Sequence, residues 1–278
     1  PRVAAVTDTV LAATLLAPGT LTLQRFPYPA HLEPGAVLVR MVASGICGTD
    51  KHTFRGETEQ YAGTDHERST PFPIIQGHEN VGVVAEIGAG GALAFDGHPL
   101  RVGDRVVPAP NRACGQCRFC LGDFPYYFCR RLENYGNSLS CADAPHLFGG
   151  WAEYLYLRPG TPIFRVPDEV PDDVAVLTEL FGVTHSLELV AAMPRPGGFR
   201  PGDSVAIIGT GPVGLVHATK AALMDAGRVI VVDPFEERVR LALELGATDG
   251  LAPSDDLAAR IRDLTDGGAD VVVDATGQ

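Results

Sequence analysis

Reactive side chains are concentrated between Gly45 and His52. Four of them fall within six positions, at Cys47, Thr49, Asp50 and His52. A thiolate is a soft metal ligand, a hydroxyl can pass on a proton, and an imidazole can carry that proton towards water. Such residues in a glycine-rich turn are often ordinary loop chemistry. The cluster becomes a candidate site only if other parts of the chain supply partners for Cys47.

The segment Gly77–Asn80 supplies such partners, at His78 and Glu79. A neutral imidazole and a thiolate are both good zinc ligands, and the adjacent glutamate is either a third ligand or a base beside the metal. A single histidine before a strand is more often structural. Taken together with Cys47, His78 favours a metal site.

Four further cysteines follow one another at close spacing, at positions 114, 117, 120 and 129. Four thiolates are the composition of a closed tetrahedral zinc site, which would brace a loop and leave no position for substrate. An iron–sulfur cluster also suits this spacing, and four reduced, buried cysteines remain an alternative. We expect a cytoplasmic protein, because no basic and apolar leader opens the chain. Metal binding is therefore favoured over disulfides.

A dinucleotide fingerprint, Gly209-Thr210-Gly211-Pro212-Val213-Gly214, lies between an apolar run and a helical pattern. Gly209 would permit a tight turn, Gly211 would let the backbone approach a pyrophosphate, and Gly214 would let helix and sheet pack closely. Asp233 closes the next strand and would accept hydrogen bonds from the adenosine ribose. No arginine or lysine occupies the three following positions, so the pattern predicts NAD rather than NADP. A glycine-rich turn without a nucleotide is the alternative.

Two kinds of domain must position these residues. Short β-branched runs at 37–43, 81–87 and 104–107 predict a barrel-like or sandwich domain of short strands, with an exposed polar loop at 53–70. Strands then alternate with helices, which predicts a parallel, doubly wound α/β domain. Its expected elements are helix 172–192, strand 204–208, a helix to 226, strand 229–233, helix 236–245, a strand near 250, helix 256–264 and strand 270–274. We therefore assign domains to 1–172, with a zinc lobe at 111–131, and to 173–278. Such a sheet usually has about six strands, so we expect the second domain to be incomplete at its C-terminus.

Composition excludes several classes of partner. The chain has 278 residues, 45% of them hydrophobic and 20% charged, which is typical of a globular protein with room for two domains. Its formal net charge of -12 argues against binding nucleic acid. No apolar run approaches the roughly 20 residues that a membrane-spanning helix needs.

Together, Gly45–Asp50, Gly77–Glu79, the four-cysteine lobe and Gly209–Gly214 with Asp233 resemble the zinc-dependent medium-chain dehydrogenases/reductases, the alcohol and polyol (sorbitol) dehydrogenase superfamily. The resemblance covers essentially the whole chain. It implies a GroES-like domain holding a catalytic Zn²⁺, a structural Zn²⁺ in the lobe, and a Rossmann domain holding NAD. It also implies a homodimer or homotetramer that acts on a small alcohol or polyol.

Roles carry over to matching positions only. The resemblance implies that Cys47 and His78 bind zinc, that Glu79 binds or flanks it, and that Asp50 orients the imidazole. Thr49 would take the substrate's proton and His52 would end the relay.

Three features depart from the family patterns: the residue after Glu179, the spacing of the lobe cysteines and the length of one loop. Glu179 resembles the glutamate of the polyol branch, which implies that it holds the catalytic zinc or the water bound to it, and this glutamate favours a secondary alcohol, sugar or cyclitol as substrate. Leu180 replaces the proline that usually follows it. The third and fourth lobe cysteines are separated by eight residues instead of the usual seven, and Pro125 and several aromatic residues lie in that gap. Cys129 is therefore the least certain lobe ligand, with Cys141 as an alternative. The loop at 53–73 also looks longer than usual.

These observations predict a reversible, zinc-dependent, NAD-linked oxidation of an alcohol to a ketone. One alternative is a zinc-free quinone or enoyl reductase of the same fold, which would lack the ligand set. The other is a dinucleotide-binding protein without catalytic activity, which the fold alone does not exclude.

Overall fold

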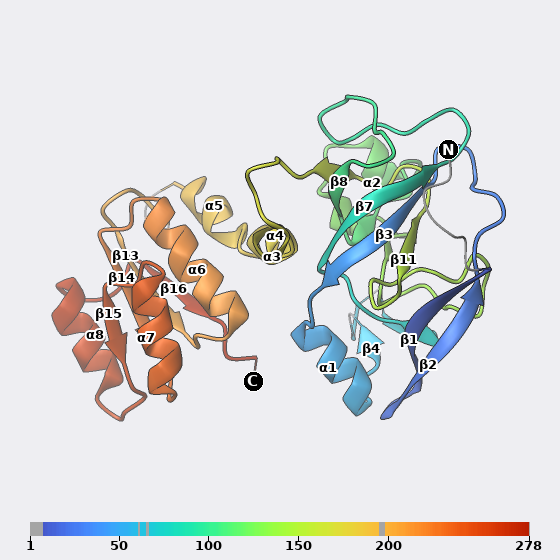
Figure 1. The fold of residues 1–278 in the computed structure, drawn as a ribbon. Coiled ribbons are helices and arrows are strands. Elements are labelled where there is room, and N and C mark those ends of the chain that lie inside the picture. The colour runs from blue at the N-terminus through green and yellow to red at the C-terminus, as the bar shows by residue number, and fades with distance from the viewer. Residues whose placement is uncertain (1–7, 61, 65–66, 195–197, 278) are drawn as a thin grey trace. The chain divides into compact units, whose positions relative to one another are not determined.

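The structure is a computed structural model that describes residues 8–60, 62–64, 67–194 and 198–277 (Figure 1). The described residues form two compact units, which divide in the sequence between Glu179 and Leu180. The boundary expected at 172/173 falls at the start of the short helix α3 (Asp172–Ala175). Each unit has its own hydrophobic core, so each is described by itself.

The first unit is built on an antiparallel sheet of five strands, in the order β11-β3-β7-β8-β12. Its strands are β3 (Val37–Ser44), β7 (Asn80–Ile87), β8 (Arg105–Pro108), β11 (Tyr154–Leu157) and β12 (Ile163–Arg165). The runs predicted at 37–43, 81–87 and 104–107 are confirmed as β3, β7 and β8. Their β-branched residues fit a pleated surface with one face against the core.

A second sheet of three strands, in the order β2-β1-β6, was not predicted. It consists of β1 (Thr9–Ala17), β2 (Thr20–Pro27) and β6 (Ile74–Ile75). Along β1, Val10, Ala12 and Leu15 are fully or almost fully buried, and Ala12 also forms a bridge to Ala152, which precedes β11. The two sheets therefore share one core, as in a barrel.

The segment predicted as one exposed loop at 53–70 is partly regular. Helix α1 (Gly48–Arg55) continues through its first three residues, and β4 (Glu59–Gln60) pairs with β5 (Arg68–Ser69). The prediction missed α1 because its first residues read as a polar turn. Gly56, with φ of +98°, ends the helix in the left-handed conformation that glycine adopts readily.

The lobe has a paired base. Strands β9 (Asn111–Arg112) and β10 (Glu133–Asn134) are antiparallel partners that bring its two ends together. Between them lie α2 (Arg118–Leu121) and the 3₁₀ turn η1 (Tyr126–Phe128).

The second unit contains a parallel sheet of four strands, in the order β15-β14-β13-β16, as the alternation of strands and helices predicted. The strands are β13 (Ser204–Ile208), β14 (Arg228–Val232), β15 (Asp249–Leu251) and β16 (Val271–Asp274). The helices are α6 (Pro212–Leu223), α7 (Glu236–Glu244) and α8 (Leu257–Thr265).

Alternate residues of β14 explain the two layers of helices around this sheet. Val229 and Val231 pack with residues of α6 and α7, whereas Ile230 and Val232 pack with residues of α8. Figure 1 shows α6 and α7 side by side across the strands. The strand order reverses between β13 and β16, and the carboxyl ends of strands at such a point form the usual ligand crevice of open α/β sheets.

The single helix predicted at 172–192 is wrong. The structure has three short helices, α3, α4 (Thr178–Val183) and α5 (Ser186–Ala191). The hydroxyls of Thr178 and Thr184 donate to backbone carbonyls three residues earlier, at 2.7 and 2.8 Å. Such bonds compete with the helical ladder, which explains why a continuous apolar pattern breaks here.

Within the described part of the chain, none of the helices combines the length and hydrophobicity that crossing a bilayer requires.

Candidate metal and dinucleotide sites

The strand pairing of the first unit brings together the ligands expected from two separate motifs. Cys47 follows β3 and caps α1, while His78 and Glu79 immediately precede β7. Ser44 of β3 pairs with Asn80 of β7, so both ligand loops leave the sheet at the same end. Ligand atoms of Cys47, His78 and Glu79 all lie within 4.8 Å of one another.

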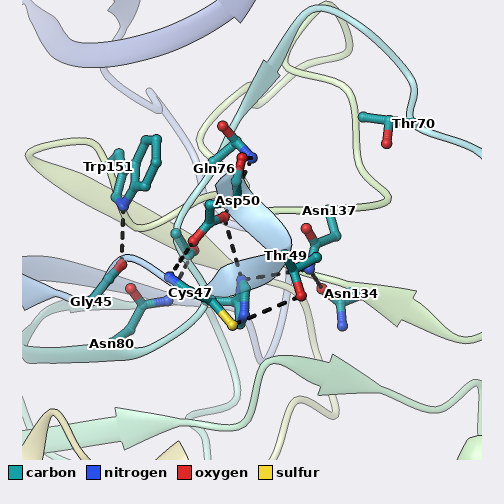
Figure 2. A network of polar contacts seen from close by, with 12 residues as sticks. Gly45, Cys47, Thr49, Asp50, Thr70, Gln76, Asn80, Asn134, Asn137 and Trp151 are labelled. Atoms are coloured by element: carbon teal, nitrogen blue, oxygen red, sulfur yellow. Dashed lines mark hydrogen bonds and ion pairs between the residues drawn. The ribbon is translucent and has the colours of Figure 1, made fainter. Parts of the chain in front are cut away.

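Asp50 forms buried contacts with Cys47 and His78 of this cluster, and Figure 2 shows it between Cys47 and Gln76. Its side chain is 1% exposed, and its Oδ2 accepts the backbone N–H of Cys47 at 2.9 Å. Its Oδ1 lies 3.6 Å from Nδ1 of His78 and 3.4 Å from Nε2 of Gln76. Because Nδ1 of His78 faces Asp50, the other ring nitrogen is the one available to a metal.

The charges around His78 suit a cation. Burial lowers the pKa of this imidazole, but Cys47, Asp50 and Glu179 outweigh burial and raise the pKa to about 9. The pKa of Glu179 is raised by burial, opposed by His78 and reinforced by Glu79 and Asp50. Several acidic groups thus converge on one imidazole, and a divalent cation would relieve their mutual repulsion. The donor set of thiolate, imidazole and carboxylate fits zinc.

Glu179 lies near this cluster without belonging to its closest group. It lies in the first turn of α4, and its carboxylate affects His78 electrostatically. Among the described residues, the group within 4.8 Å consists of Cys47, His78 and Glu79. The structure therefore places Glu179 as a neighbour of the cluster, compatible with a fourth ligand or a ligand acting through water.

Several residues that shape the cluster were missed by the sequence analysis. Trp151 donates its indole N–H to the carbonyl of Gly45 at 3.2 Å. A Cβ at Gly77 would come within 2.5 Å of the Trp151 ring, and a Cβ at Gly45 within 1.9 Å of Oε2 of Glu79. Asn137, after the lobe, approaches Nδ1 of His78 with its amide nitrogen at 3.5 Å. Only the glycines gave a signal in the sequence. Trp151 and Asn137 gave none, because the residues that they contact lie in distant segments of the chain.

The expected relay residues lie on helix α1. Oγ1 of Thr49 is 3.8 Å from Sγ of Cys47, and His52 follows three residues later, on the same side of the helix. The imidazole of His52 is 45% exposed and contacts Glu57. The helix therefore aligns a hydroxyl beside the cluster with an imidazole nearer to solvent.

All four predicted lobe cysteines come together. Their ligand atoms lie within 4.8 Å of one another, including Cys117 and Cys120 at 3.5 Å and Cys117 and Cys129 at 4.0 Å between sulfurs. The backbone N–H of Cys114 donates to the Cys129 sulfur at 3.3 Å, and N–H groups, that of Gln116 first, lower the pKa of Cys114 to about 6. Four sulfurs so arranged fit a tetrahedral metal site.

Cys141, the alternative to Cys129, lies elsewhere. It is 2% exposed within the main hydrophobic core of the first unit, and burial raises its pKa to about 11. A thiol in that setting is inert packing. Cys129 is therefore the fourth sulfur of the lobe, and the eight-residue gap is accommodated by η1.

The glycine-rich turn in the second unit has the close contacts that its sequence predicts. A Cβ at Gly209, where φ is +93°, would come within 2.8 Å of the Ala275 carbonyl oxygen. A Cβ at Gly214 would come within 1.9 Å of the Gly209 carbonyl oxygen. Gly211, in contrast, faces open space and caps the twelve-residue helix α6, with Pro212 as its first residue. A helix N-terminus with an open glycine at its cap suits a pyrophosphate.

Asp233 immediately follows β14 and is held by this same turn. Its Oδ2 accepts the N–H of Thr210 at 2.8 Å and its Oδ1 accepts the N–H of Phe235 at 2.9 Å. Burial opposes these bonds, but together with Arg238 they lower its pKa, so the carboxylate is charged near neutral pH. Nη1 of Arg238 lies 3.8 Å from Oδ2. Arg238 lies beyond the three positions after Asp233 that indicated NAD, so it was not predicted.

The fold and these sites define a class: two-domain proteins that pair a zinc-binding β domain with a dinucleotide-binding α/β domain. Residues 33–168 match the family model described as "Alcohol dehydrogenase GroES-like domain", and residues 212–278 match "Zinc-binding dehydrogenase". The chain belongs to the zinc-dependent medium-chain dehydrogenase/reductase family. The predicted fold class is thereby confirmed.

Curated relatives share about a third of the residues. A Mycobacterium tuberculosis protein named "Probable alcohol dehydrogenase adh" is 34% identical over 275 residues, which cover 97% of this chain and 70% of the relative. The scyllo-inosose 3-dehydrogenase of Thermotoga maritima is 30% identical over 258 residues, covering 91% of this chain and 62% of that enzyme. The chain thus spans between about three fifths and seven tenths of these two relatives' lengths.

Solved structures show the same architecture. An alcohol dehydrogenase from Thermotoga maritima superposes with a TM-score of 0.85 at 30% identity, over 97% of this chain and 72% of that one. Two further structures hold nicotinamide cofactors. A zinc-binding dehydrogenase from Sinorhizobium meliloti binds NADP (TM-score 0.79, 28% identity, 98% of this chain and 71% of that one). An Escherichia coli alcohol dehydrogenase is complexed with NADH (TM-score 0.75, 26% identity, 97% and 70%).

Proposed function

We propose that this chain is the catalytic and cofactor-binding portion of a zinc-dependent, NAD-linked dehydrogenase that reversibly oxidises a secondary alcohol, polyol, sugar or cyclitol to the ketone. The observation that carries the proposal is the meeting of Cys47, His78 and Glu79 within 4.8 Å, beside the Thr49 hydroxyl. Such a set would form a metal site with a proton acceptor next to it.

Cys47, His78 and Glu79 would hold the catalytic zinc, with Glu179 close by. The lobe cysteines would hold a second, structural zinc. When bound, the catalytic zinc supplies a Lewis acid that lowers the pKa of a substrate hydroxyl, and the nicotinamide supplies a hydride acceptor.

The chain's own residues would then orient the zinc ligands and transfer the substrate's proton. Asp50 fixes the His78 ring and, through the Cys47 N–H, the start of α1. The Thr49 hydroxyl receives the substrate's proton and passes it towards His52, one turn further along the helix.

The cofactor proposal rests on Asp233 and α6. The open cap at Gly211 would receive the pyrophosphate, and the Asp233 carboxylate has lone pairs left for ribose hydroxyls. A 2′-phosphate would meet that charged carboxylate, although Arg238 beside it would reduce the repulsion. We therefore propose NAD, with a preference that Asp233 maintains.

The substrate class follows from the cluster's composition. One thiolate with one or two carboxylates, from Glu79 and Glu179, makes a harder, more exchangeable site than two thiolates would. The name of the Thermotoga relative, scyllo-inosose 3-dehydrogenase, supports a cyclitol or related polyol.

Metal analysis combined with a substrate panel tests the proposal. We expect two zinc ions per chain and NAD reduction with at least one secondary alcohol or polyol. Cys47→Ser and His78→Ala should each remove one zinc and abolish turnover. Unchanged turnover after loss of that zinc would refute the assignment.

The alternatives give different results. A quinone or enoyl reductase of this fold would bind no zinc at the Cys47 cluster and would reduce quinones or enones. A binding protein would take up NAD without turnover on any substrate. Initial rates with NAD and with NADP test the proposed cofactor preference. The ratio of the two rates should be smaller in Asp233→Ala than in the wild type. A wild-type preference for NADP would overturn the proposal.

A further inference from the structure

The relay histidine has a carboxylate partner that the sequence analysis did not identify. Nδ1 of His52 lies 2.5 Å from Oε2 of Glu57. The carboxylate belongs to the residue that follows the helix cap Gly56, and it is 61% exposed. The pair therefore lies at the solvent-exposed C-terminal end of α1.

The backbone holds Glu57 in this position. At Gly56 the chain turns through the left-handed conformation, and the N–H of Glu57 then donates to the carbonyl of His52 at 3.0 Å. The same two residues are thus joined by a backbone bond and by a side-chain bond. This double connection orients the imidazole more firmly than a surface ion pair between two flexible chains.

The contact selects one form of the neutral imidazole. A carboxylate accepts hydrogen bonds and donates none, so Nδ1 of His52 must carry the hydrogen. Nε2 is then left with a free lone pair and is the basic nitrogen. In free histidine the hydrogen prefers Nε2, so the Glu57 contact holds the less common tautomer.

We infer that Glu57 is a positioning residue of the proton relay: it holds His52 with Nδ1–H bound, so that Nε2 receives the proton passed along α1. This inference rests on the proposed function. When Nε2 gains one proton, the imidazolium carries one positive charge opposite the Glu57 carboxylate. Loss of one proton to water restores the neutral ring.

Glu57 can be replaced to remove or alter its contact with His52 without unfolding the protein. An exposed ion pair contributes little to stability, so Glu57→Ala should fold and melt like the wild type. Glu57→Gln loses the charge but keeps a carbonyl oxygen that can accept the Nδ1 hydrogen. Glu59→Ala is the matched control, because Glu59 is an exposed carboxylate two residues away whose partner is the hydroxyl of Ser69, at 2.6 Å.

The first measurement does not depend on activity. Nitrogen-15 NMR of the imidazole rings, at a pH where His52 is neutral and with His52→Gln to assign its signals, reports which nitrogen carries the hydrogen. We expect the Nδ1–H form in the wild type, in Glu59→Ala and in Glu57→Gln, and a shift towards the Nε2–H form in Glu57→Ala. A wild-type ring in the Nε2–H form, or a Glu57→Ala spectrum identical to it, would overturn the inference.

The second measurement is turnover. A positioned proton acceptor contributes roughly 10²–10⁴-fold to a rate, and we expect Glu57→Ala to lose about tenfold of this in kcat, with zinc content and NAD affinity unchanged. In a His52→Gln background the same change should have no further effect. Losses that multiply across the two variants would show that Glu57 does not act through His52.

The two measurements separate the two claims. An inactive wild type with a Glu57-dependent tautomer would refute the proposed function while supporting the contact's role in orienting His52. An active wild type whose tautomer ignores Glu57 would refute only the inference.

Discussion

Replacing Asp50 with asparagine should loosen the catalytic metal site, and the size of the effect follows from the donors around this side chain. Oδ2 faces the N–H of Cys47, while Oδ1 faces Nε2 of Gln76 and Nδ1 of His78. All of these are donors when His78 uses its other nitrogen for the metal. An asparagine has only one oxygen, so either orientation of its amide turns an N–H₂ group towards a donor.

Two costs result. A buried donor without a partner destabilises the fold by about 1–3 kcal/mol. Loss of a carboxylate behind a metal-bound histidine typically weakens metal binding about 10- to 100-fold, which corresponds to about 1.4–2.7 kcal/mol. We expect the zinc affinity of the Cys47 site in Asp50→Asn to fall within this range.

Competition with a coloured chelator measures this affinity, and the four-cysteine lobe serves as an internal control within the same molecule. The variant should release one zinc at lower chelator concentration than the wild type and the second zinc at the same concentration. Asp104→Asn is the matched control, since the Asp104 carboxylate accepts the Arg101 N–H in the same unit, outside the cluster. Equal release curves for wild type and Asp50→Asn, or equal weakening of both sites, would refute the reasoning.

Three further outcomes are expected. Gly211→Ala should melt like the wild type yet bind NAD at least about tenfold more weakly in calorimetry, because its Cβ would enter the open space where the pyrophosphate approaches. Gly214→Ala should also lower the melting temperature, since its Cβ would lie 1.9 Å from a carbonyl oxygen. Normal NAD binding by Gly211→Ala would contradict this reasoning. Cys117→Ser should lower the zinc content by one per chain and increase hydrogen exchange within 111–134 alone; increased exchange throughout the first unit would contradict a local role. Burial lowers the pKa of His217 below its ordinary value of 6.5, so protonation favours the unfolded chain, and the stability that the neutral ring contributes is complete above about pH 6.5 and lost as the pH falls below it. The wild type should therefore lose more melting temperature than His217→Gln between about pH 7.5 and about pH 5.5, and parallel losses would show that another group controls this range.

Much of the second unit could be predicted from the sequence because its signals are local. Strands β13 and β14 are buried on both faces and so appear as continuous apolar runs. The failure at 172–192 has an equally local cause, since threonine hydroxyls there bond to the backbone instead of leaving the helix ladder intact. Apolar periodicity detects which residues are buried, but it does not detect that competition.

The residues of the candidate site also fall into two groups, those that the sequence could predict and those that it could not. Cys47 and His78 stand in short motifs whose residue types carry the chemistry, so the sequence was sufficient to find them. Trp151 and Asn137 act through contacts with segments more than fifty residues away, which only the folded chain brings together. Glu57 is near His52 in sequence, yet its contact depends on the turn at Gly56, which a helix-or-loop assignment does not describe.

The pairing of β9 with β10 has a consequence for how the lobe can vary. Asn111 lies opposite Asn134 and Arg112 opposite Glu133, so the lobe enters and leaves the first unit at one point. Residues added or removed between these pairs change the size of a closed loop and leave the strand register of the unit intact. The extra residue between Cys120 and Cys129 is such an addition. The lobe can therefore gain length, aromatic residues and new surface in evolution, while its four clustered sulfurs and the β9–β10 pair keep its connection to the first unit fixed.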